Sequence, residues 1–289
     1  MKIAVVTDSN SGITQAQAKE LGAFVLPMPF MIDGKEYFED ITLTQQEFYE
    51  RLEKGGDIST SQPSPDAITG LWDKLLKEYD EIVHIPMSSG LSGSCQTARL
   101  LAEEYEEKVQ VVDNHRISVT QRQSVLDALK MAKSGMSAEM IRRKMEETGA
   151  DSTIYITLDT LKYLKKGGRI TPAAAALGTL LRIKPVLTIQ GEKLDAYAKA
   201  RTMKQARAMM TAAVTRDMEE RWGDVTGEKT WIQVAHTCNI RAAQELAEEL
   251  SQLFPKAEIY VDALSLSVAC HIGPGSLAIA AVRHLELCE

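Results

Sequence analysis

The first half of the chain alternates short apolar runs with segments of helical spacing, and this alternation restricts the possible folds more than any other feature. Residues 3–6, 81–85 and 109–112 are short and rich in β-branched side chains, which is typical of buried strands. Helical spacing follows them at residues 14–21, 95–105 and 124–132. Strands that alternate with helices form βαβ units with parallel pairing. We therefore predict an N-terminal α/β domain over residues 1–150 with a mostly parallel sheet.

A small β excursion interrupts this pattern at about residues 24–40. The stretch 24–32 is apolar and contains two prolines, and the strong hairpin signal Asp33-Gly34 separates it from residues 35–38. Helices are also expected at residues 44–54 and 65–76, on either side of a second hydroxyl-rich turn.

The second half mixes hairpin and helix signals without regular alternation. The length of 289 residues favours two domains, and Gly149-Ala150-Asp151 marks the boundary between them. We predict a C-terminal α+β domain over residues 151–289. Its expected strands are residues 153–158, 183–189, 194–198, 231–235 and 258–261, and its expected helices are residues 161–166, 173–181, 202–221 and 240–254.

Charge and hydropathy exclude several classes of partner. The net charge of −7 and the pI near 5.4, without a dense cluster of lysine and arginine, argue against a nucleic-acid surface. No run approaches about eighteen apolar residues, and the N-terminal MKIAVVTDSN has only a short apolar run, so we expect neither a stable membrane anchor nor a signal peptide. The four cysteines lack CxxC spacing, which suits a reducing, cytoplasmic location.

Four dispersed turns share one chemistry, because each is short and rich in hydroxyl groups or glycine. Residues 86–94, PMSSGLSGS, lie between a predicted strand and a predicted helix, where unpaired backbone N–H groups meet the positive end of the helix dipole. The others are residues 8–12, 60–65 and 271–276. Hydroxyls, a histidine and backbone amides can together hold a carboxylate, whose two oxygens accept about four hydrogen bonds. An ordinary helix-capping loop explains each single turn equally well.

An enzyme would need a nucleophile with a base. Ser92 lies in GLSGS, which approaches a nucleophile elbow but has Ser94 in place of the last glycine. With His271 as the base and Asp8 as its orienting group, a serine hydrolase stays open as an alternative. No histidine has metal-ligand spacing and no GxxxxGK[ST] phosphate loop occurs, so we expect neither a metal nor a cofactor.

A basic stretch surrounds a Gly-Gly helix stop at residues 167–168. Cations in a last turn complement the helix dipole and glycine supplies the left-handed cap, which gives this stretch an ordinary structural explanation. A docking patch for an acidic partner is the alternative. The basic residues are Lys162, Lys165, Lys166 and Arg169.

Taken together, these motifs resemble the signature set of the DegV family. The resemblance runs from Asp8-Ser9 to the final strand, and the joint occurrence of the motifs in this order is highly specific. In order they are TSQPSP at residues 60–65, SGLSG at 89–93, LKYLKKGGRI at 161–170, IKP at 183–185, RT at 201–202 and HIGPG at 271–275.

The resemblance implies a two-domain fold with a long-chain fatty acid, such as palmitate, buried between the domains. Family members that occur with the matching kinase act as the acyl-binding subunit of fatty acid kinase. The chain would then be a non-catalytic, lipid-binding bacterial protein that presents the carboxylate to a partner kinase for acyl phosphate formation. A fatty-acid-responsive sensor is a further alternative, since it differs from a carrier only in its partner.

Motif by motif, the resemblance also assigns site residues and no catalytic residue. Thr60 and Ser92 would contact the carboxylate, and the glycines would donate backbone N–H groups or allow close approach. Lys165, Lys166 and Arg169 would face the partner. The expected carboxylate-binding set is Thr60, Ser61, Ser92, Gly93, Arg201, His271 and Gly275.

Three positions depart from the family pattern. Ile58-Ser59 precede the TSQPS turn, where prolines or threonines are usual. Ile272 replaces a common threonine beside His271. Around Thr120-Gln121-Arg122 the glycines expected beside the glutamine are missing, which bears on the shape of the expected tail pocket.

Overall fold

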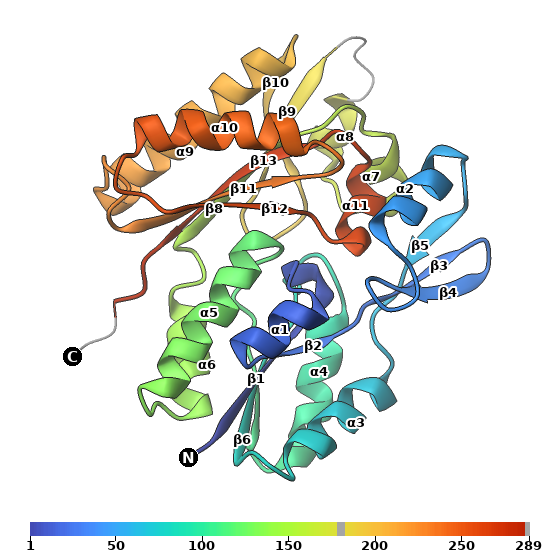
Figure 1. Ribbon diagram of the computed structural model, residues 1–289, viewed down its shortest axis with the longest axis vertical. Helices are drawn as coiled ribbons and strands as arrows, with labels where there is room; N and C mark the ends of the chain where they lie inside the picture. The colour runs from blue at the N-terminus through green and yellow to red at the C-terminus, as the bar shows by residue number, and fades with distance from the viewer. Residues whose placement is uncertain (178–182, 287–289) are drawn as a thin grey trace. The chain divides into compact units, whose positions relative to one another are not determined.

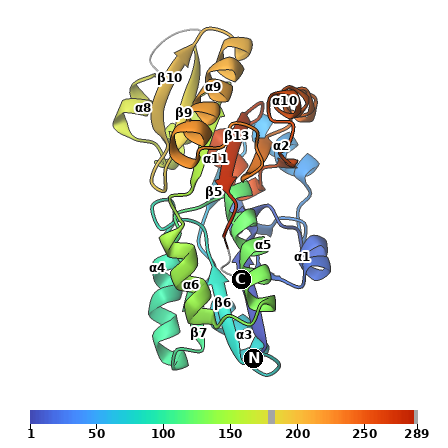
Figure 2. The same ribbon diagram turned by 90° about the vertical axis from the view of Figure 1, so that its left-hand side faces the viewer.

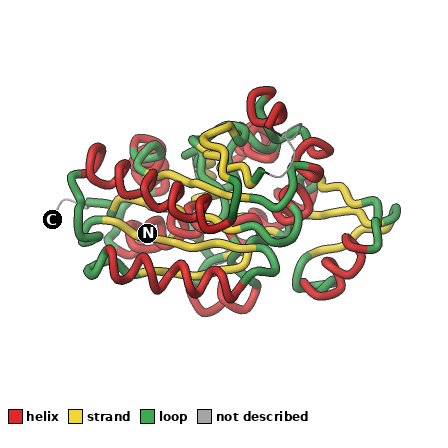
Figure 3. The backbone as a smooth tube through the Cα atoms, turned by 90° about the horizontal axis from the view of Figure 1, so that it is seen from above, coloured by secondary structure: helices red, strands yellow, loops and turns green. Residues whose placement is uncertain are grey.

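The structure is a computed structural model that describes residues 1–177 and 183–286, and it divides into two compact units. Within the described residues, unit 1 comprises residues 1–150 and 265–267, and unit 2 comprises residues 151–264 and 268–286. Strands and helices occur in both described stretches of the chain (Figure 3). Unit 1 contains a parallel sheet and unit 2 is of the α+β type, so the predicted fold class is confirmed.

The main sheet of unit 1 is parallel throughout, with the strand order β2-β1-β6-β7. Its strands are β1 (Ile3–Asp8), β2 (Phe24–Leu26), β6 (Glu81–Ile85) and β7 (Val109–Val111). The helices around it are α1 (Gln15–Leu21), α3 (Pro65–Leu75), α4 (Ser94–Ala102), α5 (Val119–Lys133) and α6 (Ala138–Glu147), with short 3-10 turns η1 (Ser9–Ser11) and η2 (Glu103–Tyr105).

The two faces of this sheet are covered by different helices (Figure 1). On one face, Trp72 of α3 and Ala98 of α4 pack against Val6 and Ile82 in a buried cluster. On the other face α5 lies against β1 and β6. Because both faces are buried, the strands are near-continuous apolar runs, which is the pattern that the sequence shows.

An ion pair and a hydrogen bond connect α4, α6 and β7 at one edge of the sheet. Arg99 of α4 lies 2.6 Å from Glu146 of α6, and Arg142 donates to Gln110 of β7. The helix α6 was not predicted from the sequence, although Ala138, Ile141 and Met145 form its buried face. Helix α5 begins five residues before the predicted position, because its first turn buries polar side chains that hide the helical spacing.

The predicted β excursion at residues 24–40 is partly wrong. Phe24–Leu26 forms β2 of the parallel sheet, since Val6 pairs with Phe24 in parallel register. The excursion consists of β3 (Pro29–Ile32), β4 (Lys35–Phe38) and β5 (Ile58–Thr60), in the order β4-β3-β5, with α2 (Gln45–Glu53) between β4 and β5. Three residues are too few for periodicity to separate a sheet strand from a loop.

Unit 2 is built on a mixed six-stranded sheet with the order β10-β9-β8-β13-β11-β12, in which only β11 and β12 pair in parallel. The strands are β8 (Ser152–Thr157), β9 (Lys184–Ile189), β10 (Asp195–Ala200), β11 (Thr230–His236), β12 (Ile259–Ala263) and β13 (Leu277–Arg283). The helices are α7 (Lys162–Gly167), α8 (Pro172–Leu177), α9 (Met203–Trp222) and α10 (Ile240–Leu253). Helix α11 (Leu266–Ile272) has its first two residues in unit 1 and the rest in unit 2.

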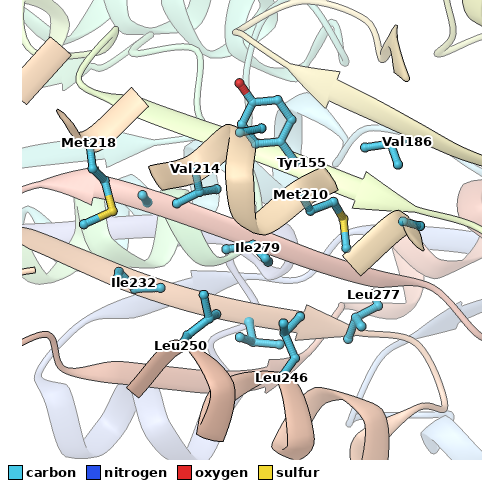
Figure 4. Close-up of a cluster of buried hydrophobic side chains, with 14 of the residues drawn as sticks. Tyr155, Val186, Met210, Val214, Met218, Ile232, Leu246, Leu250, Leu277 and Ile279 are labelled. Atoms are coloured by element: carbon cyan, nitrogen blue, oxygen red, sulfur yellow. The ribbon is translucent and has the colours of Figure 1, made fainter. Parts of the chain in front are cut away.

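The core of unit 2 lies between this sheet and two long helices. Met210 and Val214 of α9 and Leu246 of α10 face Ile232 and Ile279 of the sheet (Figure 4). Helix α9 also runs along β9 and β10 (Figure 2). Met210 and Met218 of α9 therefore fill an ordinary core, and the partly buried Met209 packs against it.

Two elements near the C-terminal end of the described residues were not located from the sequence, α11 and β13. The strand reads LAIAAVR, and an alanine-rich apolar run gives no periodicity that separates a buried strand from a helix. Helix α8 is described as far as Leu177, and the remaining part of the predicted helix 173–181 lies outside the described residues. Cys288 also lies outside them.

Candidate functional site

The strand order of unit 1 defines where a ligand site can form. From β1 the chain moves to β2 on one side, whereas from β6 it moves to β7 on the other. Ligands of parallel sheets bind outside the carboxyl ends of the strands at such a reversal. The turns that follow β1 and β6 are residues 8–12 and 86–94, so two of the four predicted turns meet at this point.

The turn at residues 86–94 is held by hydrogen bonds of its own. The carbonyl of Ser88 accepts from the N–H groups of Leu91 (3.0 Å) and Ser92 (3.2 Å), and the Ser88 hydroxyl accepts from Gly90 N–H (3.1 Å). The Ser92 hydroxyl accepts from Ser94 N–H at 3.2 Å. Because this bond uses a lone pair of the Ser92 oxygen, its own proton stays available for an acceptor.

Asp8 ends β1 directly beside this turn and is only 1% exposed. Its Oδ2 accepts from Met87 N–H at 2.8 Å, and its Oδ1 accepts from Asn10 N–H (3.0 Å), Asn10 Nδ2 (2.9 Å) and Gln121 Nε2 (3.1 Å). Burial raises the pKa of Asp8, and these hydrogen bonds oppose that rise. Asp8 lies in one of the candidate turns marked by the sequence, whereas the sequence linked Gln121 only to the shape of the expected tail pocket.

The TSQPSP turn reaches the same region of unit 1 through Gln62. Its Oε1 accepts from the hydroxyl of Thr97 in α4 at 3.2 Å, and a Cβ on Gly93 would lie 3.3 Å from it. Ser61 N–H donates to the carbonyl of Pro29, and Thr60 is the last residue of β5. The turns at residues 60–65 and 86–94 are therefore neighbours.

Ser64 of the same motif has a local role. Its hydroxyl accepts from Ala67 N–H at 3.2 Å, which makes it the N-cap of α3, and Pro65 occupies the first helical position as predicted.

The other predicted residues belong to unit 2, where the HIGPG loop fits tightly against the segment around α7. A Cβ on Gly167 would lie 2.3 Å from His271 Nδ1, and one on Gly273 would lie 2.4 Å from the ring of Tyr163. Gly275 has φ +82°, and its missing Cβ would lie 2.5 Å from Asp159 Oδ2. These glycines let the two segments pack backbone against side chain.

The backbone of this loop is already hydrogen-bonded within unit 2. Gly275 N–H donates to the carbonyl of Thr237 at 2.8 Å, and Asn239 Nδ2 donates to the carbonyl of Gly275 at 3.3 Å. Ser276 N–H donates to the Thr237 hydroxyl, which donates to Gly273 O at 2.6 Å. Gly275 was expected either to donate its backbone N–H or to allow close approach to its backbone. Because its N–H already donates to Thr237, the second function is the one compatible with this geometry.

His271 lies in the last turn of α11 and is largely buried. Burial lowers its pKa to about 4, and the positive charge of Arg169 adds to this effect. The imidazole is therefore neutral at physiological pH and can donate from one nitrogen and accept at the other. Burial also raises the pKa of the adjacent Cys270 thiol to about 12, which keeps that thiol protonated.

The cationic residues of the prediction differ in exposure. Arg201 is exposed, directly before the N-cap Thr202 of α9, and its backbone N–H donates to Gln205 Oε1. Lys165 and Lys166 are exposed on α7, and Arg169 donates to the carbonyl of Gly167. Gly168 caps α7 in the left-handed conformation, so the predicted helix stop is confirmed.

Residues 1–177 and 183–286 contain neither a cluster of metal-ligating side chains nor a helix that could span a membrane. In this part of the chain no group of three or more His, Cys, Asp or Glu side chains could hold a metal ion. None of its helices is long and apolar enough to cross a membrane.

Comparison with known proteins identifies the family. The model of the DegV family matches residues 2–284. The chain belongs to the DegV family. A DegV domain-containing protein from Deinococcus radiodurans is 31% identical over 283 residues, which cover 97% of this chain and 98% of that protein. The resemblance drawn from the sequence motifs is confirmed.

Solved structures of DegV proteins share the whole fold. A DegV family protein from Thermus thermophilus, described by its fatty acid binding, has a TM-score of 0.88 and 32% identity, and the match covers 98% of this chain and 100% of that one. DegV from Bacillus subtilis, described as a fatty acid binding protein, has a TM-score of 0.86 and 29% identity, with 98% and 99% covered.

Proposed function

We propose that this DegV protein binds a long-chain fatty acid in a buried pocket and presents its carboxylate to a partner kinase for acyl phosphate formation. The observation that carries the binding step is the likeness over the full chain to a fatty-acid-binding DegV protein at 32% identity. In this proposal the protein itself is not an enzyme and needs no cofactor. A cytoplasmic location stays a prediction from the cysteine pattern.

The chemistry of the turns supports a carboxylate as the polar end of the ligand. Ser92 keeps a proton to donate, and the Thr60-Ser61 turn lies beside Gly93 through Gln62. In unit 2 a neutral His271 can donate one hydrogen bond without the desolvation cost of a buried charge. We propose Thr60, Ser61, Ser92, Gly93, Arg201, His271 and Gly275 as the carboxylate-binding set, with Lys165, Lys166 and Arg169 toward the partner.

The free energies of tail burial and of head-group hydrogen bonding indicate different roles for the two parts of the ligand. Burying about fourteen methylenes at ~0.8 kcal/mol each contributes on the order of 11 kcal/mol before ordering costs. One charge-assisted hydrogen bond contributes about 1.5–3 kcal/mol. The tail therefore sets most of the affinity, and the hydroxyl turns set the orientation of the carboxylate.

The Thr60→Val variant tests this division of roles. The substitution keeps the size of the side chain and removes its hydroxyl, so we expect the lipid to copurify as in the wild type while phosphorylation of the acid by the partner kinase is impaired. Native mass spectrometry measures the first, and acyl phosphate formation the second. Complete loss of lipid in Thr60→Val would contradict the proposal.

Lipid extraction followed by native mass spectrometry separates the carrier from the serine hydrolase. A carrier takes up about one acyl chain per protein chain and shows no esterase activity. An empty pocket together with esterase activity that Ser92→Ala abolishes would favour the hydrolase. A carrier that binds lipid but supports no acyl phosphate formation with any kinase would instead be a sensor.

A further inference from the structure

We infer that Asp8 is a positioning residue for the carboxylate site, because it fixes the peptide from which the Ser92 turn is built. The inference rests on the proposed fatty-acid function. Asp8 does not itself contact the ligand; it acts through Met87 and Ser88.

The strand order brings Asp8 to the turn. Asp8 and Met87 are 79 positions apart in the chain, yet Asp8 Oδ2 accepts from Met87 N–H at 2.8 Å because β1 and β6 are parallel neighbours. Both residues lie at the carboxyl ends of their strands, where the strand order reverses. The Asp8 carboxylate therefore accepts a hydrogen bond from the first part of a turn that we expect to bind a ligand.

Met87 is linked to Ser92 through its neighbour Ser88. Its neighbour Ser88 is anchored by its N–H on the carbonyl of Arg116 at 2.9 Å, and the Ser88 carbonyl accepts from Ser92 N–H at 3.2 Å. The position of the Met87–Ser88 segment therefore affects where the Ser92 hydroxyl lies. Met87 N–H belongs to the Pro86–Met87 peptide, so its release would free this segment on its N-terminal side.

Asp8 is itself held from the opposite face of the sheet by Gln121. The side chain of Gln121 is fully buried on α5, and its Nε2 lies 3.1 Å from Asp8 Oδ1, Thr7 Oγ1 and the carbonyl of Ile85. Gln121 thus joins the carboxyl ends of β1 and β6. Its Nε2 is therefore paired, as a buried polar group needs to be, whereas its Oε1 has no hydrogen-bond partner among the described residues.

Asn10 completes the shell around Asp8. It donates to Asp8 Oδ1 from both its backbone and its side chain, and its Oδ1 accepts from the hydroxyl of Ser267 at 2.6 Å. Four donors therefore converge on the two oxygens of Asp8. Such a fixed carboxylate can hold a backbone N–H in one place.

The Asp8→Asn variant tests the inference, because asparagine has the same shape but only one acceptor oxygen. If that oxygen keeps the donors of Asn10 and Gln121, the amide nitrogen faces Met87 N–H, and two donors then oppose each other. The turn that carries Ser92 must shift to relieve this contact.

Asp224→Asn is the matched control. Asp224 is 3% exposed and also binds a cluster of donors, among them Gly227 N–H (2.9 Å), Lys229 N–H (2.9 Å) and the Thr230 hydroxyl (2.7 Å). It organises a loop before β11 and touches none of the proposed site residues. Both variants should lower stability, so loss of stability alone cannot explain a difference between them.

The readout is the ratio of the dissociation constants of hexadecanol and palmitate, measured for each protein after delipidation. The two ligands share a tail, so the ratio reports the head group alone, and a general loss of stability changes both constants together. We expect Asp8→Asn to reduce the preference for the acid by about tenfold, the equivalent of one charge-assisted hydrogen bond. Asp224→Asn should leave the ratio unchanged.

The outcomes separate the inference from the proposed function. Wild-type protein that binds palmitate no better than hexadecanol would overturn the carboxylate site and this inference with it. Wild-type protein that prefers palmitate, with the same preference in Asp8→Asn, would overturn the inference only. If Asp8→Asn does not fold, Gln121→Met decides: a preference reduced about threefold supports the inference, and an unchanged preference rejects it.

Discussion

Gly167 is the residue where the absence of a side chain matters most for the candidate site. The site for its Cβ lies 2.3 Å from His271 Nδ1, inside the space of the buried ring. Alanine normally stabilises a helix relative to glycine by about 1 kcal/mol. We expect Gly167→Ala to destabilise the protein instead, because the His271 ring has to move.

Gly70→Ala provides the control for this prediction. Gly70 also lies inside a helix, α3, and nothing occupies the 4 Å around its missing Cβ. Gly70→Ala should raise the free energy of unfolding by about 0.5–1 kcal/mol. Urea unfolding of both variants, with the imidazole signals of His271 followed by NMR, measures the difference. A stabilised Gly167→Ala with unmoved signals would contradict the packing.

His84 makes stability depend on pH. Its ring lies 5.5 Å from that of Trp72, and neither of its nitrogens has a hydrogen-bond partner among the described residues. Burial lowers its pKa to about 4, against about 6.5 in the unfolded chain. Between these values the unfolded state binds a proton that the folded state does not, so stability falls as the pH drops from about 6.5 to about 4.

The His84→Leu variant should remove this part of the pH dependence. Leucine fills a similar volume and leaves no unpaired polar atom, so the variant should be at least as stable as the wild type at pH 7. Between pH 7 and pH 4.5 it should lose about 2 kcal/mol less than the wild type. Urea unfolding at the two pH values measures this, and an equal loss in both proteins would disprove it. His271, whose pKa is also lowered, contributes with the same sign in both proteins.

At the scale of elements, the TSQPSP motif contains the N-cap of α3 and, in the proposed function, part of the carboxylate site. Ser64 caps α3, and Ser61 is exposed next to β5. Ser64→Ala should lower the free energy of unfolding by about 1 kcal/mol and leave the preference for acid over alcohol unchanged. Ser61→Ala should leave stability within about 0.5 kcal/mol and reduce that preference. Unfolding and binding measured on both variants check this, and the reverse pattern would refute the division.

At the scale of the whole molecule, ligand binding should raise the free energy of unfolding. A ligand that binds only the folded state adds about 2.7 kcal/mol at a free concentration of about one hundred times its dissociation constant. Palmitate should therefore raise the Tm of delipidated protein. Octanoate at the same concentration should raise it far less, because each missing methylene removes about 0.8 kcal/mol of burial. Differential scanning fluorimetry measures both, and equal shifts would place the binding energy in the head group.

The sequence alone determined the local elements and the family. The strand Glu81–Ile85, the helix that starts at Pro65 and the Gly168 cap follow from β-branched runs, a proline at the first helical position and a glycine in the left-handed conformation. These signals act over a few residues. The ordered set of motifs was enough to identify a DegV protein.

The tertiary structure decided which distant residues meet. No local pattern places Phe24–Leu26 beside β1 or β13 in the middle of its sheet, because strand order depends on pairing between segments far apart in the chain. The same holds for Asp8, whose partners Met87 and Gln121 lie 79 and 113 positions away. The sequence marked the hydroxyl turns as a candidate carboxylate site, but only the parallel pairing of β1 and β6 brings the buried Asp8 within hydrogen-bond distance of Met87 in one of them.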